Sequence, residues 1–229
     1  MRRALILDTE TNSLSPEDGQ VIEVAACLYD LEIGCPIESY ASLVRADGNS
    51  AEHVNGIPAS ALVDARHPIE VWRRVLELAN AADVVVAHNA EFDRSFVRAA
   101  GIASVADKNW VCTRSDFVWG VGGEGGGRKL VEIALGLGLG VASAHRALTD
   151  VDLMARIFTR LKERGVDLPE LFKRAARPKK RFVAMVSFEM KHLAKEAGFA
   201  WNPERREWWR MMPPDDVEAL SFRVVQKDA

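Results

Sequence analysis

The chain has 229 residues, of which 48% are hydrophobic, which is enough for one sizeable domain with a small appendage. Its three cysteines are an odd number without paired spacing, so we expect reduced thiols and neither a disulfide framework nor a zinc site. Arg2 and Arg3 lead directly into an apolar run, and no run approaches the roughly 20 residues of a membrane helix. These features exclude a membrane protein and predict a soluble, cytoplasmic one.

The net charge of −3 hides an asymmetry between the two parts of the chain. Residues 1–173 carry 18 Lys+Arg and 25 Asp+Glu, a net charge of −7. Residues 174–229 carry 12 Lys+Arg and 8 Asp+Glu, a net charge of +4. The basic tail is therefore the part expected to attract a polyanion, although an ordinary basic linker would give the same charge.

Residues 1–175 have the pattern of an α/β domain with a mixed five-stranded sheet. Apolar runs predict strands at residues 4–7, 21–29, 40–44, 83–87 and 110–113. Short turn-rich links predict that the first three form an antiparallel meander. Helical spacing predicts helices over residues 69–79, 91–100, 130–137 and 151–161. Gly101 and Gly165 are expected to end the second and fourth of these helices.

A small α+β appendage is predicted after a basic linker at residues 176–181. Within residues 182–229 the pattern indicates a strand at 182–186, a helix at 188–197 and a hairpin at 199–211. The hairpin turn is expected at residues 202–204, and a short helix after Pro214.

Two carboxylates lie two residues apart at the end of the first predicted strand. Asp8 and Glu10 point to one face of the sheet, while Thr9 points to the other. Crowded carboxylates repel each other unless a divalent cation lies between them, and oxygen ligands suit Mg²⁺ or Mn²⁺ better than zinc. A solvated strand end explains this pair equally well when it is considered alone.

A third acidic residue follows the fourth predicted strand. Asn89 is a predicted N-cap, which places Asp93 in the first helical turn, where the helix dipole partly offsets its charge. Glu91 is expected to be a solvated acid of the same turn, and His88 to be a structural residue at the strand end.

A histidine and a fourth acidic residue precede the last helix of the body. His145 and Asp150 are five residues apart, so on one helix they would differ by about 140° of rotation and would not share a face. We therefore place Asp150 at the helix start and His145 on the preceding loop, where a histidine can act as a general base. Asp152 points away from Asp150 and is expected to have no role.

These segments resemble the three exonuclease motifs of DnaQ-like 3′–5′ exonucleases of the DEDDh branch. The resemblance covers roughly residues 1–165 and includes all five characteristic residues: Asp8, Glu10, Asp93, His145 and Asp150. It implies an RNase H-like fold and two Mg²⁺ or Mn²⁺ ions. It also implies that Asp8 bridges both ions, that Glu10 and Asp150 complete the first, and that Asp93 acts on the second. By the same resemblance, His145 would deprotonate the attacking water and nucleoside 5′-monophosphates would be released.

Two departures from the family pattern bear on substrate fit. Many members continue the first motif with Thr-Gly, whereas this chain has Asn12-Ser13-Leu14, and many have a His-Gly-Ile loop where this chain has Asn55-Gly56-Ile57. Neither departure touches an expected metal ligand. The residues expected to contact the terminal nucleotide are Thr9, Thr11, Leu14 and Asn89. The glycine-rich run at residues 120–127 lacks the Lys-Ser/Thr ending of a P-loop and is expected to be a flexible loop near the site.

Aromatic and basic residues alternate in the predicted C-terminal hairpin. Trp201, Trp208 and Trp209 are interleaved with arginines that include Arg205 and Arg206. Such a hairpin suits a stacking platform for single-stranded nucleic acid, with Trp208 and the two arginines as contacts. A domain of about 50 residues also needs large core side chains, so packing is an open alternative. Alternation predicts that Trp201 and one of the other two are buried.

The predicted function is a 3′–5′ exonuclease acting on single-stranded or frayed DNA ends. An RNA-trimming exonuclease is the near alternative, because the metal site does not distinguish the sugars. A non-catalytic nucleic-acid-binding protein is a third, which the five intact residues disfavour. Sliding-clamp peptides usually need a glutamine, and Gln20 and Gln226 give no clear clamp-binding motif. A polymerase or repair partner is possible, but a stand-alone repair or maturation enzyme fits better than a clamp-dependent proofreader.

Overall fold

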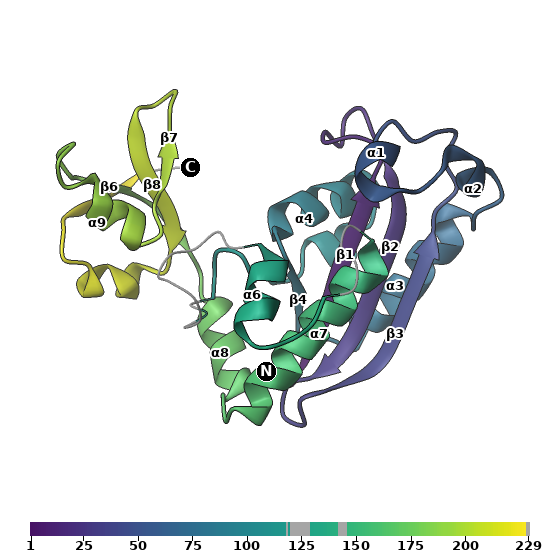
Figure 1. The fold of residues 1–229 in the computed structure, drawn as a ribbon, viewed down its shortest axis with the longest axis horizontal. Helices are drawn as coiled ribbons and strands as arrows, with labels where there is room; N and C mark the ends of the chain where they lie inside the picture. Colours follow the sequence, from purple (N-terminus) through teal and green to yellow (C-terminus); the bar gives the residue numbers. More distant parts are fainter. Residues whose placement is uncertain (118, 120–128, 142–145, 228–229) are drawn as a thin grey trace.

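A computed structural model describes residues 1–117, 119, 129–141 and 146–227. The body is a five-stranded sheet in the order β3-β2-β1-β4-β5, shown in Figure 1. Its strands are β1 (Arg3–Thr11), β2 (Val21–Asp30), β3 (Cys35–Leu43), β4 (Val84–Ala87) and β5 (Trp110–Cys112). The pairs β1–β2 and β2–β3 are antiparallel, and β1–β4 and β4–β5 are parallel. The predicted mixed sheet and its meander are thus confirmed.

Strand β3 begins five residues earlier than its apolar pattern predicted. Pro36 was expected in a turn, but it pairs with Tyr29 next to a register shift between Leu28 and Tyr29. Proline is tolerated there because β3 is an edge strand and an irregular register leaves no ladder hydrogen bond to lose. Residues 36–39 of β3 are exposed and the others are half-buried, which explains why hydrophobicity alone did not reveal the first half of the strand.

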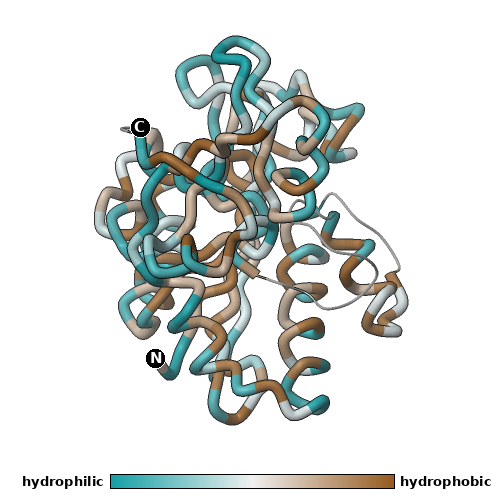
Figure 2. Tube along the Cα trace, turned by 90° about the vertical axis from the view of Figure 1, so that its left-hand side faces the viewer, coloured by the Kyte–Doolittle hydropathy of each residue, from teal (hydrophilic) through white to brown (hydrophobic). Residues whose placement is uncertain are grey.

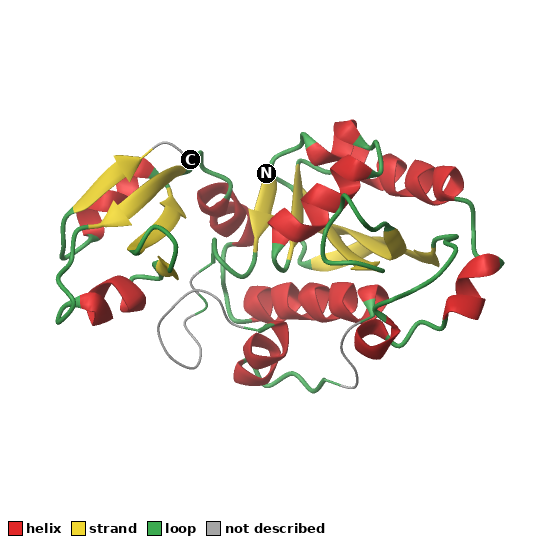
Figure 3. Ribbon diagram, turned by 90° about the horizontal axis from the view of Figure 1, so that it is seen from above, coloured by secondary structure: helices red, strands yellow, loops and turns green. Residues whose placement is uncertain are grey.

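Helices cover both faces of the body sheet, as Figure 3 shows. One face packs on α6 (Leu130–Gly136), α7 (Ala147–Glu163) and α8 (Leu168–Ala175). The other packs on α3 (Pro68–Asn80), α4 (Ala90–Ala99) and α5 (Ala103–Ala106). Along β1, Ala4 and Ile6 belong to the first core and Leu5 and Leu7 to the second. In Figure 2, hydrophobic and hydrophilic stretches alternate within the helices, as expected when one side of each lies on a sheet.

The four predicted helices of the body are confirmed, but short helices were missed. Gly101 and Gly165 follow α4 and α7 with positive φ of 81° and 82°, the left-handed conformation that ends a helix. The missed ones are α1 (Glu52–Asn55), α2 (Ala59–Val63), α5 and α8. The first three have four or five residues, too few for a helical period to show.

The tail forms a second, four-stranded sheet in the order β7-β8-β6-β9. Its elements are β6 (Lys180–Ala184), α9 (Lys191–Glu196), β7 (Ala200–Asn202), β8 (Glu207–Met212), the 3₁₀ helix η1 (Pro214–Ala219) and β9 (Val224–Lys227). The predicted strand, helix, hairpin and final short helix are present. Strand β9 was not predicted, because its four residues are half-buried or exposed and too short for an alternating pattern to stand out.

The predicted basic linker makes specific contacts. Lys179 forms an ion pair with Asp116 of the body, and Arg177 forms one of 2.7 Å with Asp216 of the tail. Lys180 already begins β6, and the side chain of Arg181 is buried. The domain boundaries at 175 and 182 stay a prediction.

No helix in the described ranges has the length and apolarity needed to cross a membrane.

Phe158 lies at the centre of the aromatic cluster that fixes α7 to the sheet. Its ring contacts Tyr29, Phe117 and Phe172 at centroid distances of 5.9, 6.1 and 5.0 Å. We expect Phe158→Ala to lower the free energy of unfolding by about 3–5 kcal/mol, because it removes a buried ring and leaves a cavity. Ile69→Ala, at a position that is 73% exposed on α3, should change it by about 0.5 kcal/mol or less. Denaturant unfolding measures both, and similar values for the two variants would contradict this account of the core.

Candidate active site

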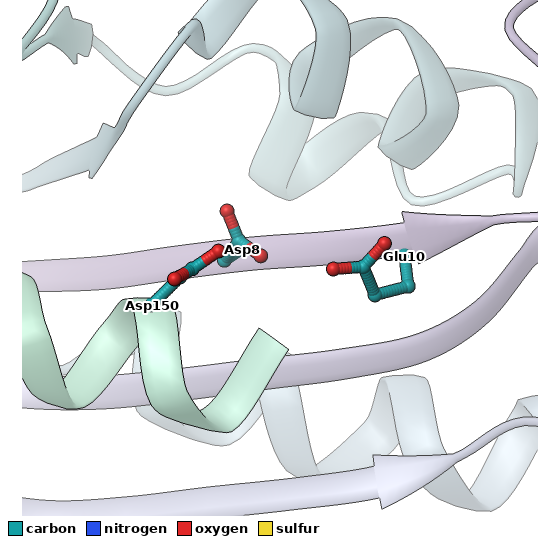
Figure 4. Close-up of side chains that lie close together, drawn as sticks. All are labelled: Asp8, Glu10 and Asp150. Atoms are coloured by element: carbon teal, nitrogen blue, oxygen red, sulfur yellow. The ribbon is translucent and has the colours of Figure 1, made fainter. Parts of the chain in front are cut away.

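Three carboxylates lie close together where the carboxyl end of β1 is next to the start of α7. Asp8 and Glu10 come from β1 and Asp150 from the first turn of α7, as Figure 4 shows. Each offers an oxygen such that all three oxygens lie within 4.8 Å of one another. Asp8 continues the side of β1 that carries Ala4 and Ile6, which is the side covered by α7. The alternation of the strand and the packing of α7 therefore bring together residues 140 positions apart.

Asp93 approaches the same strand from the other face. It lies in the first turn of α4, as predicted, and only 2% of it is exposed. Its Oδ1 accepts hydrogen bonds from the backbone N–H of Thr9 at 2.9 Å and from the Thr9 hydroxyl at 2.8 Å. These bonds fix the carboxylate on Thr9, close enough to Asp8 to act on it electrostatically. Because its hydroxyl is used in this way, Thr9 positions Asp93, and its predicted contact with substrate stays untested.

Asn89 occupies the N-cap position of α4 but does not cap the helix as expected. Its φ is +84°, in the left-handed region, and its side chain makes no capping hydrogen bond. A sharp turn between β4 and α4 imposes this conformation, which asparagine tolerates better than most residues. Neighbouring His88 is structural, as predicted, since its Nδ1 lies 2.8 Å from the Thr113 hydroxyl. Glu91 is exposed, also as predicted.

The crowded carboxylates resist ionisation. Burial, followed by the charges of Asp93 and Asp150, raises the pKa of Asp8 well above its usual value. Burial and then Asp150 raise the pKa of Glu10 to about 7. Burial also raises the pKa of Asp93, although the Thr9 hydrogen bonds oppose this shift. The folded chain thus holds these side chains together at an electrostatic cost that a bound cation would remove.

Sequence reasoning missed a fifth carboxylate and its partner. Glu23 of β2 lies directly opposite Glu10 and is 4% exposed. It accepts hydrogen bonds from Arg146 Nε at 3.0 Å, Arg146 Nη2 at 2.7 Å and the backbone N–H of Ala147 at 3.0 Å. This bidentate pair attaches the start of α7 to β2 and neutralises Glu23. The detectable signal was a glutamate inside an otherwise apolar strand.

The segment after β1 is fixed by a buried asparagine. Asn55 donates from Nδ2 to the carbonyl of Thr11 at 3.3 Å, and its Oδ1 accepts from Asn49 and Ile57. Thr11 is buried and its hydroxyl donates to the Ser13 carbonyl at 2.6 Å, whereas 89% of Leu14 is exposed. Asn55 therefore supports the backbone at the end of β1 although it replaces the histidine common in the family.

Two predicted features lie outside the described residues. They are His145, the expected general base, and the glycine-rich run at 120–127. Arg146, which follows His145, is the N-cap of α7. Asp152 lies on the exposed side of α7, 3.9 Å from Arg156, so the expectation that it points away is confirmed.

The donor set fits a hard divalent cation. Asp8, Glu10 and Asp150 offer carboxylate oxygens, the ligands that Mg²⁺ and Mn²⁺ prefer, and the three described cysteines are elsewhere.

The chain belongs to the exonuclease family, whose model matches residues 5–158. It is thus a DnaQ-like exonuclease, a nuclease of a family that depends on divalent metal ions. A second model, of a domain of unknown function, matches residues 180–226.

The curated relatives are DNA polymerase III proteins, namely PolC-type polymerases and a subunit epsilon. The chain is 30% identical over 161 residues to the DNA polymerase III subunit epsilon of Treponema pallidum, covering 66% of this chain and 73% of the relative. It is 28% identical over 164 residues to the PolC-type DNA polymerase III of Thermotoga petrophila, covering 69% of this chain. The chain spans 12% of the length of that PolC relative.

Solved structures share the fold at low identity. The nuclease domain of 3′hExo, a DEDDh family member bound to rAMP, superposes with a TM-score of 0.59 at 18% identity, covering 73% of this chain and 94% of that one. E. coli exonuclease I in complex with a dA16 oligonucleotide superposes with a TM-score of 0.62 at 18% identity, covering 90% of this chain and 53% of that one. These matches confirm the RNase H-like fold.

The raised pKa values predict an unusual pH dependence of stability in the metal-free protein. A carboxyl whose folded pKa exceeds its unfolded pKa stabilises the fold at low pH, and this stability is lost as pH rises through the folded value. For Glu10 this window runs from its ordinary value of about 4.3 to about 7. In EDTA, we expect the thermal midpoint to fall as pH rises through this window, and Mg²⁺ or Mn²⁺ to restore it most strongly above neutrality.

Glu10→Gln should flatten this pH profile and weaken the metal-induced shift, because the amide does not ionise. Differential scanning calorimetry of both proteins with EDTA and with Mg²⁺ makes the comparison. Superimposable metal-free profiles of the two proteins would contradict the assigned electrostatics.

The Glu23–Arg146 pair predicts a measurable coupling between β2 and α7. Removing either partner should lower the free energy of unfolding by about 2 kcal/mol, below the ~3–5 kcal/mol of fully buried pairs because Arg146 is half exposed. In a double-mutant cycle of Glu23→Gln and Arg146→Gln, we expect a coupling of about 1–2 kcal/mol.

The exposed Asp152–Arg156 pair of the same helix is the control, and it should give less than about 0.5 kcal/mol. Equal coupling energies for the two pairs would show that the Glu23–Arg146 pair has no special role.

Proposed function

We propose that this chain is a metal-dependent 3′–5′ exonuclease that releases nucleoside 5′-monophosphates from single-stranded or frayed DNA ends. The observation that supports this most is the convergence of Asp8, Glu10 and Asp150 within 4.8 Å, with Asp93 close enough to Asp8 to act on it electrostatically. Carboxylates this close together repel one another, and this repulsion adds to burial in raising the pKa values of Asp8 and Glu10, so the cluster carries a cost to folding that a metal site would explain.

Asp8, Glu10 and Asp150 would hold one Mg²⁺ or Mn²⁺ ion, and Asp8 and Asp93 a second. Such ions lower the pKa of a bound water and neutralise charge that develops on the phosphate. His145, which directly precedes the N-cap residue of α7 in the sequence, would take the proton from the attacking water. Arg146 orients the start of α7 through Glu23, and Thr9 holds the Asp93 carboxylate.

DNA is proposed as the substrate because the curated relatives are DNA polymerase III components. RNA ends are the second candidate, since a metal site made of carboxylates acts on the phosphate and does not distinguish the two sugars. Thr11, Leu14 and Asn89 are proposed to face the terminal nucleotide, where exposed Leu14 can pack against a base.

The same relatives make a polymerase partner, and hence proofreading, a proposal beside stand-alone DNA repair. A purely binding protein on this fold is less consistent with the structure, because binding alone needs no cluster of acids to face an anionic strand.

Asp150→Asn should lower the rate of 3′ shortening by at least about 100-fold, because metal ions supply several kcal/mol of transition-state stabilisation. Asp152→Asn, two residues later on the exposed side of α7, should retain full activity. Degradation of matched 5′-labelled DNA and RNA oligonucleotides with Mg²⁺, Mn²⁺ or EDTA measures both variants and the sugar preference. If no oligonucleotide were shortened by the unmodified protein, or if EDTA had no effect, the proposal would be wrong.

A further inference from the structure

The β7–β8 hairpin of the tail carries a pair of tryptophans, of which one is exposed and the other half-buried. Trp201 and Trp208 lie directly opposite each other in the two strands, with ring centroids 5.5 Å apart and planes inclined at 54°. Trp208 packs against the core of the tail, whereas 47% of Trp201 is exposed on the outermost strand. The sequence predicted that Trp201 and one of Trp208 and Trp209 are buried and that the other is exposed, whereas Trp201 is the exposed residue and Trp208 and Trp209 are half-buried. Trp201 is exposed because β7 is an edge strand, so the Trp201 side chain has no neighbouring strand on one side.

Two arginines project from the turn of the same hairpin. Arg205 and Arg206 are exposed, and Arg206 has a positive φ of 52°. The turn is held by Asn202, whose Oδ1 accepts from the backbone N–H of Arg205 at 2.9 Å. Within the described ranges, neither guanidinium has an acidic group within 4 Å.

The nearest strand acid does not cancel this charge. Glu207 forms ion pairs with buried Arg181 and with Lys227 (2.8 Å), which together lower its pKa to about 2. Glu204 is the remaining acid of the turn, and it is exposed. The hairpin surface, which we define as Trp201, Trp208, Arg205 and Arg206, is therefore aromatic and basic, in a tail of net charge +4 attached to a body of −7.

We propose that this hairpin surface binds single-stranded nucleic acid, namely the part of the substrate strand that lies 5′ to the end held at Asp8. The exposed ring of Trp201 can stack on any base, and the guanidinium groups of Arg205 and Arg206 can contact backbone phosphates, so the surface suits a strand of arbitrary sequence. Figure 1 shows the hairpin and the carboxyl end of β1 on the same, upper side of the molecule. The strand would thus be held by the basic tail while the acidic body hydrolyses its end. This inference rests on the proposed exonuclease function.

The first test measures binding in the inactive Asp8→Asn background. Fluorescence anisotropy with an oligonucleotide of about 30 nucleotides, longer than the ~4–16 that a small binding domain covers, reports affinity. We expect Trp201→Ala to weaken binding about 10-fold, the size of one base stack, and Trp201→Phe to restore most of the loss. Arg205→Gln/Arg206→Asn should weaken binding and reduce its salt dependence, since two phosphate contacts are removed. Asparagine suits the left-handed position 206, so this variant should fold.

The second test uses the active protein and two substrates. For the long oligonucleotide, Trp201→Ala and the double arginine variant should raise KM about 10-fold and leave kcat nearly unchanged. For the p-nitrophenyl ester of thymidine 5′-monophosphate, which is too short to reach the tail, neither parameter should change. Ile37→Ala, which alters an exposed residue of β3, should match the unmodified protein with both substrates.

The two proposals fail in different ways. If the unmodified protein hydrolyses neither substrate, the exonuclease function is wrong, while the anisotropy experiment still decides whether the hairpin binds. If the protein is active but the Trp201 and arginine variants bind the oligonucleotide as tightly as Ile37→Ala, the hairpin is not a nucleic-acid surface. That result would also be the one expected if the hairpin contacted another protein instead.

Discussion

Electrostatic repulsion among the carboxylates around the end of β1 is the constraint on which the rest of the structure depends. Asp8, Glu10 and Asp150 lie within 4.8 Å, and Asp93 lies close enough to Asp8 to act on it electrostatically. Burial and mutual repulsion raise the pKa of Asp8 and bring that of Glu10 to about 7. Such a cluster persists because packing elsewhere over-determines the positions of its backbone, and a divalent cation would relieve the repulsion.

Helix α7 connects this cluster to the hydrophobic core. Its inner side contributes Phe158 to an aromatic cluster with Tyr29 and Phe172, while its first turn presents Asp150 to β1. The Glu23–Arg146 pair attaches the same turn to β2 and offsets the charge of Glu23, which lies opposite Glu10. Stability and site geometry are thus coupled through one helix, so core mutations far from the carboxylates should also disturb activity.

Much of the fold could be predicted from local sequence patterns, and the elements that were predicted wrongly or not at all have physical explanations. Continuous apolar runs identified β1, β2 and β4 because these strands are covered on both faces. The first half of β3 was not predicted because its residues are exposed on an edge strand. Helices α1, α2 and α5 were not predicted because four or five residues are too few to show a helical period. Trp201 was placed wrongly because alternation along a strand gives a side chain's face but not whether a neighbouring strand covers it.

The sequence by itself determined the chemical identity of the site. The two-residue spacing of Asp8 and Glu10, and the positions of Asp93 and Asp150 at helix starts, follow from strand and helix periodicity. Tertiary structure alone decided which other side chains pair with the groups at the site and hold them in position. The pairing of Glu23 with Arg146 spans 123 positions and that of Thr9 with Asp93 spans 84, so no local pattern encodes either contact. Long-range contacts depend on how whole elements pack, and packing also left Trp201 facing solvent on the tail.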